Sequence, residues 1–343
     1  MIALDISATA VKLLELGRAG RRLSVESCAI APLPPDAVIE RRIVNIQAVG
    51  RSIRRAVRHC GSRARDAILA IPESAVIHTV LSVPSVTDDA ELESQVELAA
   101  ARRLPLPIDR AHFDFKVLGP SRSQPAQLDV LLVAAPSAAV AARAAACESG
   151  GLNPHVMDTE PYALEHAATL LTAELPAGGR GKTIAIIDTG ATQTLLTVLH
   201  DMETIYTHSQ PFGGAQLTHA VMRCFGLDFE QAERYKRQGG VPARGHADIL
   251  PALRNRLAQR LHRALQTFLA SPDGQPLDQV ALAGGGANIT GIAPQLQSQI
   301  GVPVQRADPL RSLSAGRRVN RRALTPYGPA MMLACGLALR RFD

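Results

Sequence analysis

Apolar and polar positions follow one another in short runs along the chain, and two of these runs share one plan. Residues 2–16 consist of an apolar strand, Asp5, a small polar turn and a second apolar strand, and residues 184–199 repeat this order around Asp188. Two strands joined by a tight polar turn are typical of a β-hairpin. We therefore predict that the chain contains two copies of one plan, each opening with a hairpin.

The rest of the pattern alternates between strands and helices, which is typical of an α/β protein. Residues 46–60 place apolar side chains on one helical face and arginines largely on the other, and a short buried strand follows at 66–71. Residues 74–157 form a self-contained series of strands and helices. The elements predicted after them are helices at 161–175, up to 224, at 229–238, 249–270 and 329–339, and strands at 204–209, 279–282 and 302–306.

These elements predict three structural units. The first half comprises residues 1–72 and 158–182, together with residues 325–343, whose apolar helix is expected to pack back into it. Residues 73–157 form an inserted α+β subdomain. Residues 183–324 form the second half, which opens with the second hairpin.

Composition narrows the class of protein. With 343 residues, 46% hydrophobic and 20% charged, the chain matches an ordinary soluble protein of about two domains. The absence of Trp and an aromatic content of 3% argue against a nucleic-acid-binding surface, where bases stack on aromatic rings. No apolar run approaches the roughly 18 residues of a membrane span, and Asp5 comes too early for a signal peptide. Five cysteines without a CxxC pair predict free thiols in a reducing compartment.

The net charge of +6 comes almost wholly from arginine and is spread along the chain. Such mild basicity is compatible with a place beside an anionic membrane surface without demonstrating it. The most arginine-rich stretch, residues 311–322, is expected to be an exposed loop. Contact of this loop with a partner or with lipid is the alternative.

Residues 181–183, Gly-Lys-Thr, imitate the end of a phosphate-binding P-loop. The complete pattern requires a glycine where Pro176 stands, and a P-loop follows a strand and opens a helix. Here the segment precedes a strand. We interpret it as a flexible joint between the two halves.

Two glycine-bearing turns and one charged pair are candidates for ligand binding. Gly213 and Gly214 open a helix, whose amide dipoles favour an anion, although a tight turn without a ligand is the alternative. Residues 284–286 form a glycine triplet after a strand, where backbone can lie against a nucleoside. Glu233 and Lys236 lie three residues apart on one helical face, a spacing that in isolation indicates a surface ion pair.

In their order, these motifs resemble those of the actin-like ATPase superfamily, which includes actin, the 70 kDa heat-shock chaperones, sugar kinases and bacterial cell-division proteins. The resemblance rests on Asp-x-Ser-Ala-Thr at 5–9, Asp-x-Gly-Ala-Thr at 188–192, the glycine pair and the glycine triplet. It implies an actin-like ATPase fold, in which two ribonuclease H-like halves surround a nucleotide cleft and the first half carries the inserted subdomain.

Within the superfamily, the whole chain resembles the PilM family of type IV pilus assembly proteins, in segments such as PLPPDAV at 32–38, KRQGG at 236–240 and LACGLALRRFD at 333–343. This resemblance implies a cytoplasmic ATP-binding scaffold associated with the inner membrane through its partners. It would hold the N-terminal cytoplasmic tail of the membrane protein PilN in a groove beside the inserted subdomain. Other pilus assembly components, or further copies in a homo-oligomer or ring, are the remaining partners that it implies.

The resemblance also implies roles for individual residues toward ATP and Mg²⁺. Asp5 and Asp188 would orient the metal ion through its retained waters. The implied phosphate-binding residues are Asp5, Ser7, Ala8, Thr9, Lys12, Gly190, Ala191, Thr192, Gly213 and Gly214, and the implied adenosine-binding residues are Glu233, Lys236, Gly284, Gly285, Gly286 and Asn288.

Two alternatives share this fold, a polymerising cytoskeletal protein like the cell-division protein FtsA and a small-molecule kinase. A kinase needs a carboxylate base and a pocket for the phosphate acceptor, and no motif in the sequence indicates either. Ser7 stands where many superfamily members carry glycine, and no Asp, Glu or Gln announces itself as the residue that positions an attacking water. Catalytic residues therefore stay unassigned, and we expect a weak ATPase at most.

Overall fold

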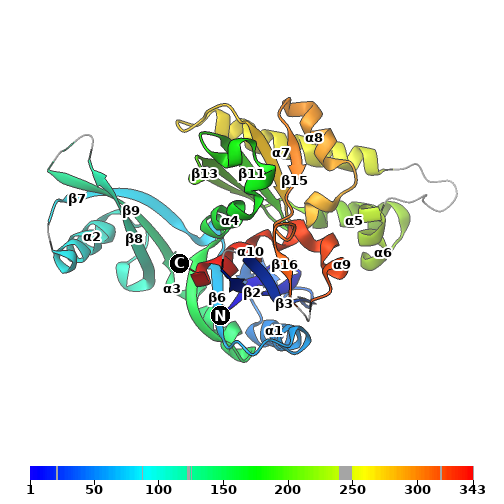
Figure 1. Ribbon diagram of the computed structural model, residues 1–343, viewed down its shortest axis with the longest axis horizontal. Coiled ribbons are helices and arrows are strands. Elements are labelled where there is room, and N and C mark those ends of the chain that lie inside the picture. The colour runs from blue at the N-terminus through cyan, green and yellow to red at the C-terminus, as the bar shows by residue number, and fades with distance from the viewer. Residues whose placement is uncertain are drawn as a thin grey trace.

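The computed structural model describes residues 1–20, 22–86, 88–121, 124, 126–238, 249–316 and 319–342 (Figure 1). Gly239 and Gly240 of the KRQGG segment lie outside the described residues, as do Arg317 and Arg318 of the arginine-rich stretch. Within these ranges, no helix has both the length and the apolar character that crossing a membrane requires.

Two sheets with the same strand order form the centre of the molecule. The second sheet has the order β13-β12-β11-β14-β15, and the first repeats it as β3-β2-β1-β6-β10, with β16 added beside β3. In each sheet the hairpin is antiparallel, and its first strand also runs parallel to a later strand. The predicted duplication is therefore confirmed.

The strands of the first sheet are β1 (Ile2–Ile6), β2 (Ala10–Ala19), β3 (Arg22–Pro32), β6 (Asp66–Ile71), β10 (Asn153–Thr159) and β16 (Ser314–Ala315). Those of the second are β11 (Thr183–Thr189), β12 (Thr194–His200), β13 (Glu203–Gln210), β14 (Gln279–Ala283) and β15 (Val304–Arg306).

Helices cover the outer faces of the two sheets and fill the space between them (Figure 1). The outer face of the first sheet carries α1 (Ile46–Cys60) and α3 (Ser137–Ser149), and α4 (Glu160–Ala168) and α10 (Met332–Leu339) lie between the sheets. The outer face of the second sheet carries α5 (Gly214–Phe225), α6 (Phe229–Gln238), α7 (Leu250–Leu269) and α8 (Ile292–Ile300).

Helix α1 has the bounds that the sequence predicts. The side chain of Asn45 accepts a hydrogen bond from the amide of Ala48 at 2.9 Å and so caps its first turn. Gly61 adopts a left-handed conformation with φ of 65°, which ends the helix. Val49 and Ile53 are fully buried against the first sheet.

Helix α4 is shorter than the predicted helix at 161–175. It ends at Ala168, and a 3₁₀ segment continues over Thr169–Glu174. The hydroxyl of Thr169 donates to the carbonyl of His166 at 2.6 Å, and the hydroxyl of Thr172 donates to that of Thr169 at 3.2 Å. Threonine hydroxyls that bond local carbonyls compete with the regular α-helical pattern, which the apolar periodicity alone does not reveal.

The inserted subdomain forms a lobe beside the two sheets (Figure 1). Its three-stranded sheet has the order β7-β9-β8, and α2 packs against it around a separate apolar core. Asp88 caps α2 by accepting a hydrogen bond from the amide of Glu91 at 3.0 Å. The elements of the lobe are β7 (Ile77–Pro84), α2 (Asp89–Arg103), β8 (Ala111–Pro120) and β9 (Gln127–Pro136).

Two predicted boundaries need correction. Residues 137–157 were assigned to the subdomain, but β10 pairs with β6 in the first sheet, and α3 packs against α1. Residues up to 324 were assigned to the second half, but β16 pairs with β3, so part of the expected arginine-rich loop is a strand of the first sheet. We therefore propose that the subdomain spans residues 73–136 and that the chain re-enters the first half before residue 314.

The contact between α4 and α10 generates a stability prediction. A Cβ atom added at Gly336 would lie 1.6 Å from the carbonyl oxygen of Ala163, in a core that contains residues of both sheets. We expect Gly336→Ala to lower the free energy of unfolding by about 3 kcal/mol, because two backbones would have to separate. The urea-unfolding midpoint measures this effect.

Gly20→Asn is the matched control, because Gly20 has φ of 61° with open space around it and asparagine tolerates this conformation. Equal midpoints for Gly336→Ala and the wild type would show that α4 and α10 are not closely packed.

Candidate functional site

Alternation along the strands turns two aspartates toward the space between the sheets. In β1, Leu4 packs toward α1, whereas Ala3 belongs to the core around α4. Asp5 lies two residues after Ala3 and so projects from the same face. In β11, Ile186 belongs to the core around α4, and Asp188 follows at the same spacing. The repeated plan therefore brings both predicted metal-orienting carboxylates to the space between the halves.

The turns of the two hairpins have one backbone design. The amide of Ser7 donates to the carbonyl of Ala10 at 3.0 Å, and the amide of Gly190 donates to that of Gln193 at 2.9 Å. Where the second turn has glycine, the Ser7 hydroxyl makes an additional bond to Ala10 O at 2.8 Å. This serine is therefore accommodated by a hydrogen bond within the turn.

A cavity of about 340 Å³ lies between the two turns, within the roughly 300–1,000 Å³ of small-molecule sites. Of the predicted residues, Ala8, Thr192 and Gly213 do not line it. Those that do are Asp5, Ser7, Thr9, Lys12, Asp188, Gly190, Ala191, Gly214, Glu233, Lys236, Gly284, Gly285, Gly286 and Asn288. Residues predicted from both halves thus converge on one space.

The two carboxylates differ in their neighbours. Lys12 pairs with Asp5 across β1 and β2, and its Nζ lies 2.7 Å from Asp5 Oδ2. The corresponding partner of Asp188 is Leu195, which carries no charge. Burial raises the pKa of Asp188 above its ordinary value, against the opposing effect of Lys12.

A raised carboxyl pKa has a consequence for stability. An acid whose folded-state pKa lies above its unfolded value favours folding most when it is protonated, and this contribution is lost as the pH rises through the folded-state pKa. The ionised form of Asp188 therefore costs stability in the ligand-free protein. A cation placed beside Asp188 would offset that cost.

The donor set fits Mg²⁺ held partly by water and phosphate. Across the described residues, no group of three or more His, Cys, Asp or Glu side chains could hold a metal ion. Mg²⁺ keeps several waters and is usually held by one or two carboxylates together with substrate phosphates. Asp5 and Asp188 supply two carboxylates at the cavity, so a phosphate ligand would have to complete the site.

Gly213 and Gly214 have a different role from the one implied by the family. The amide of Gly214 donates to the carbonyl of Gly190 at 2.9 Å, and the amide of Ala215 donates to that of Ala191 at 2.8 Å. A Cβ atom on Gly213 would lie 2.5 Å from each of these carbonyl oxygens. The amides of Gly214 and Ala215 therefore hold the second hairpin turn in place and are not open to an anion.

The glycine triplet brings backbone close to the second aspartate. Gly284 has φ of 75°, and a Cβ atom there would lie 2.2 Å from Asp188 Oδ1. At Gly286 a Cβ atom would meet the side chain of Thr189 at 2.5 Å, whereas at Gly285 it would meet nothing within 4 Å. Two of the glycines are thus required for packing, and the third leaves open space at the cavity wall.

Lys236 and Glu233 are not the surface pair that their spacing suggests. The Lys236 side chain is 7% exposed, and its Nζ forms an ion pair with Glu233. The same Nζ donates to Gly214 O at 3.1 Å and to Thr218 Oγ1 at 2.8 Å. This lysine therefore joins α6 to the start of α5 at the cavity wall.

Several cavity residues carry no motif and were missed by sequence reasoning. They are Arg41, Glu160, Gln193, Phe229 and Tyr327, with apolar neighbours such as Leu195. Comparison of the two repeats could have pointed to Gln193, because it lies in the second turn. Nothing in the sequence pattern could have identified Arg41, since its position depends on a tertiary contact.

The contacts of Lys182 show that the Gly-Lys-Thr segment at residues 181–183 has a structural role and is not a P-loop. Its Nζ lies 2.9 Å from Asp278 Oδ1, and Lys182 is not among the residues that line the cavity. The same aspartate accepts a hydrogen bond from the amide of Thr183 at 2.8 Å, so the pair fixes the start of β11. Backbone and lysine contacts both lower the pKa of Asp278.

The chain is similar to a known protein family and to several solved structures. The model of the family described as type IV pilus assembly protein PilM matches residues 3–342. A chain of the solved PilM-PilN type IV pilus biogenesis complex is 29% identical, with a TM-score of 0.81, and the match covers 100% of this chain and 98% of that one.

Two more distant solved structures match in fold alone. The ethanolamine utilization protein EutJ from Carboxydothermus hydrogenoformans is 16% identical with a TM-score of 0.54, over 98% of this chain and 88% of that one. MreB 5 of Spiroplasma citri bound to AMPPNP is 11% identical with a TM-score of 0.52, over 100% of this chain and 95% of that one. Together these matches confirm the predicted actin-like ATPase fold.

The two lysine pairs permit a matched stability test. Lys236→Met should lower the free energy of unfolding by about 3 kcal/mol, because it leaves Glu233 and two hydrogen-bond acceptors without their buried cation. Lys182→Met should cost less than about 1 kcal/mol, since that pair is 37% and 32% exposed. Equal costs in urea unfolding without nucleotide would contradict the structural role of Lys236.

Proposed function

Because this chain belongs to the PilM family of type IV pilus assembly proteins, we propose that it is a cytoplasmic ATP-binding scaffold of the inner-membrane assembly platform. One observation carries the nucleotide part of this proposal. Both hairpin turns, the glycine triplet and the α5–α6 junction meet at a single cavity between the halves. Binding a ligand there holds the two halves together, which is the scaffold role that we propose.

The polyphosphate end of ATP would lie between the two hairpin turns. Asp5 and Asp188 would hold Mg²⁺ through water, and Lys12, Ser7, Thr9, Gly190 and Ala191 would contact the phosphates. When bound, the magnesium ion would supply positive charge that offsets part of the negative charge of the phosphates and the two carboxylates. Gly213 supports the second turn and is not proposed as a phosphate ligand.

The adenosine end would lie against the second half. Gly285 leaves open space beside Gly284 and Gly286, and Asn288 lines the cavity nearby. Lys236 and Glu233, which form an ion pair within α6, also line the cavity. The cavity contains Gln193 and Glu160 but no arrangement that assigns a catalytic role to either, so ATP binding, with a weak ATPase at most, is the function proposed.

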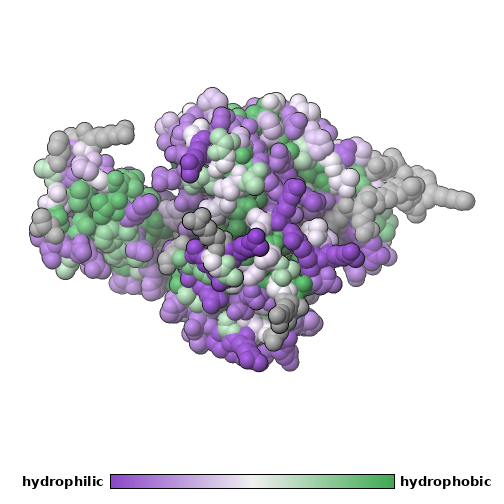
Figure 2. All heavy atoms as spheres, in the orientation of Figure 1, coloured by the Kyte–Doolittle hydropathy of each residue, from purple (hydrophilic) through white to green (hydrophobic). Residues whose placement is uncertain are grey.

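For the partner, we propose that the inserted subdomain takes part in binding the N-terminal tail of a PilN-like membrane protein. The similar solved chain comes from a PilM-PilN complex. Strand β8 lies at an edge of the subdomain sheet, and its Val117 and Leu118 are 42% and 53% exposed. Figure 2 shows apolar side chains on the visible face of this lobe. An extended peptide beside an edge strand gains backbone hydrogen bonds and pockets for apolar side chains.

The nucleotide proposal is tested with Asp188→Asn. A ligand that binds only the folded state raises the melting temperature, so MgATP should stabilise the wild type and not this variant. Without nucleotide, Asp188→Asn should melt at or above the wild-type temperature, because burial disfavours the charge that it removes. Glu230→Gln, on the exposed face of α6, is the matched control and should keep the full MgATP response. Equal MgATP shifts in all three proteins would disprove the site.

The partner proposal is tested by titrating a labelled peptide with the sequence of a PilN-like N-terminal tail. Leu118→Asp should weaken its binding about tenfold or more, because it adds a charge to the apolar edge of the subdomain. Leu269→Asp, at a 48% exposed position on α7 of the second half, should bind like the wild type. If the wild type fails to bind the peptide with and without MgATP, the tail-binding proposal is wrong.

A further inference from the structure

Arg41 reaches the cavity from a two-residue turn that is unfavourable for its sequence. The turn joins β4 (Val38–Ile39) to β5 (Arg42–Ile43), and Glu40 and Arg41 have φ of 47° and 66°. Such turns favour glycine, asparagine and aspartate, because other side chains are strained at positive φ. Strain in the turn that carries Arg41 into the cavity indicates that the direction of this side chain has been selected.

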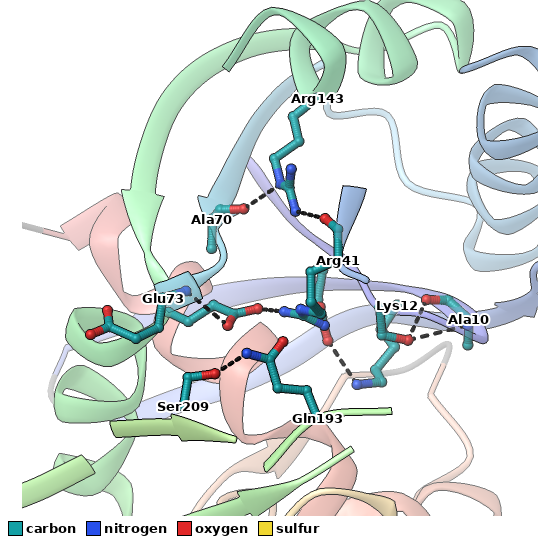
Figure 3. Close-up of polar contacts among 11 residues, drawn as sticks. Ala10, Lys12, Arg41, Ala70, Glu73, Arg143, Gln193 and Ser209 are labelled. Atoms are coloured by element: carbon teal, nitrogen blue, oxygen red, sulfur yellow. Dashed lines mark hydrogen bonds and ion pairs between the residues drawn. The ribbon is translucent and has the colours of Figure 1, made fainter. Parts of the chain in front are cut away.

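A second arginine holds this turn in place. Arg143, on α3, is 3% exposed, and its Nη2 donates to the carbonyl of Arg41 at 3.1 Å. Its Nε donates to Ala70 O at 2.9 Å, so the same side chain ties the turn to the end of β6 (Figure 3). Burial and the nearby Arg41 lower the pKa of Arg143 to about 9. A buried cation is thus used to fix the backbone of the turn.

The Arg41 guanidinium lies among the carboxylates of the cavity. It forms an ion pair with Glu160, and the charges of Asp5 and Asp188 both act on it. Its Nε is buried, and no acceptor for it exists among the residues that the structure describes. Because Arg41 lines the cavity and its guanidinium pairs with Glu160, a phosphate in the cavity can take the place of that carboxylate.

Guanidinium groups bind phosphate well, because their planar, fixed donors match two phosphate oxygens at once. We propose that Arg41 is a phosphate-binding residue of this cavity and that Glu160 is its counter-ion in the ligand-free protein, which a nucleotide phosphate replaces. This inference rests on the ATP-binding function proposed above. It adds a residue outside the repeated hairpins to the predicted phosphate-binding set.

Glu160 is also hydrogen-bonded at the junction of the three structural units. Its replacement as the partner of Arg41 therefore affects that junction. Glu160 Oε2 accepts a hydrogen bond from the amide of Glu73 at 3.4 Å. The Glu73 carboxylate accepts a bond from Thr207 Oγ1 of β13 at 2.5 Å and lies 3.0 Å from His78 Nε2 of β7. A change at Glu160 therefore alters contacts at the start of the subdomain and at the edge of the second sheet.

The test compares ligands that differ in their phosphates. Arg41→Met should weaken MgATP binding about tenfold or more in calorimetry, while adenosine affinity changes less than about twofold. Arg41→Lys should recover part of the loss, because it restores the charge without the planar donors. Arg42→Met, at the exposed neighbouring position, is the matched control and should bind both ligands like the wild type.

Glu160→Gln tests the exchange of counter-ions. It should tighten MgATP binding several-fold, because a phosphate no longer competes with a carboxylate for Arg41, and this gain should vanish when Arg41→Met is also present. Hydrogen exchange of the amides at 73–78 should respond to MgATP in the wild type and not in Arg41→Met. A purely structural role for Arg41 would instead weaken ATP and adenosine binding equally, and that result would overturn the inference.

These outcomes separate this inference from the proposed function. If MgATP binds the wild type and Arg41→Met equally well, while Asp188→Asn fails to bind it, ATP binding stands and the role of Arg41 is wrong. If MgATP does not bind the wild type at all, both proposals are wrong. Melting temperatures without ligand, measured for each variant, show that the compared proteins are folded.

Discussion

The contact between α4 and α10 is the constraint on which the rest of the structure depends. These helices fill the space between two duplicated sheets, and their core contains residues from both, so neither sheet has a separate apolar interior on that side. The backbones approach so closely at Gly336 and Ala163 that no side chain fits between them. Because the halves are joined along one region by apolar packing, they leave a cavity at the hairpin turns, where charged side chains from both halves meet.

Inside that cavity, charge is arranged at a cost to the ligand-free fold. Asp188 is partly buried without a neighbouring cation on its own sheet, and Arg41 is positioned by a strained turn and by a buried arginine. Unfavourable groups that persist in one place are typical of sites whose stability is recovered when a ligand binds. The surrounding layers differ from the cavity, because their apolar packing is stable without any ligand.

The sequence predicted most of the fold because the fold is a repeated local pattern. The repeated strand-turn-strand plan located Asp5 and Asp188, and the bounds of α1 followed from its apolar face. The boundary of the subdomain was wrong, because the pairing of β10 with β6 joins strands that are far apart in sequence. Arg41 was missed for the same reason, since no local pattern shows which cavity a two-residue turn will face.

The duplicated hairpins are related by an approximate symmetry that their side chains break. Lys12 stands beside Asp5, whereas the matching position beside Asp188 is Leu195, and both residues line the same cavity. Two identical hairpins would offer an elongated anion the same surroundings in either direction. Because a cation stands beside one aspartate and an apolar side chain beside the other, the two hairpin turns offer different surroundings, which favours one orientation of a ligand charged at one end.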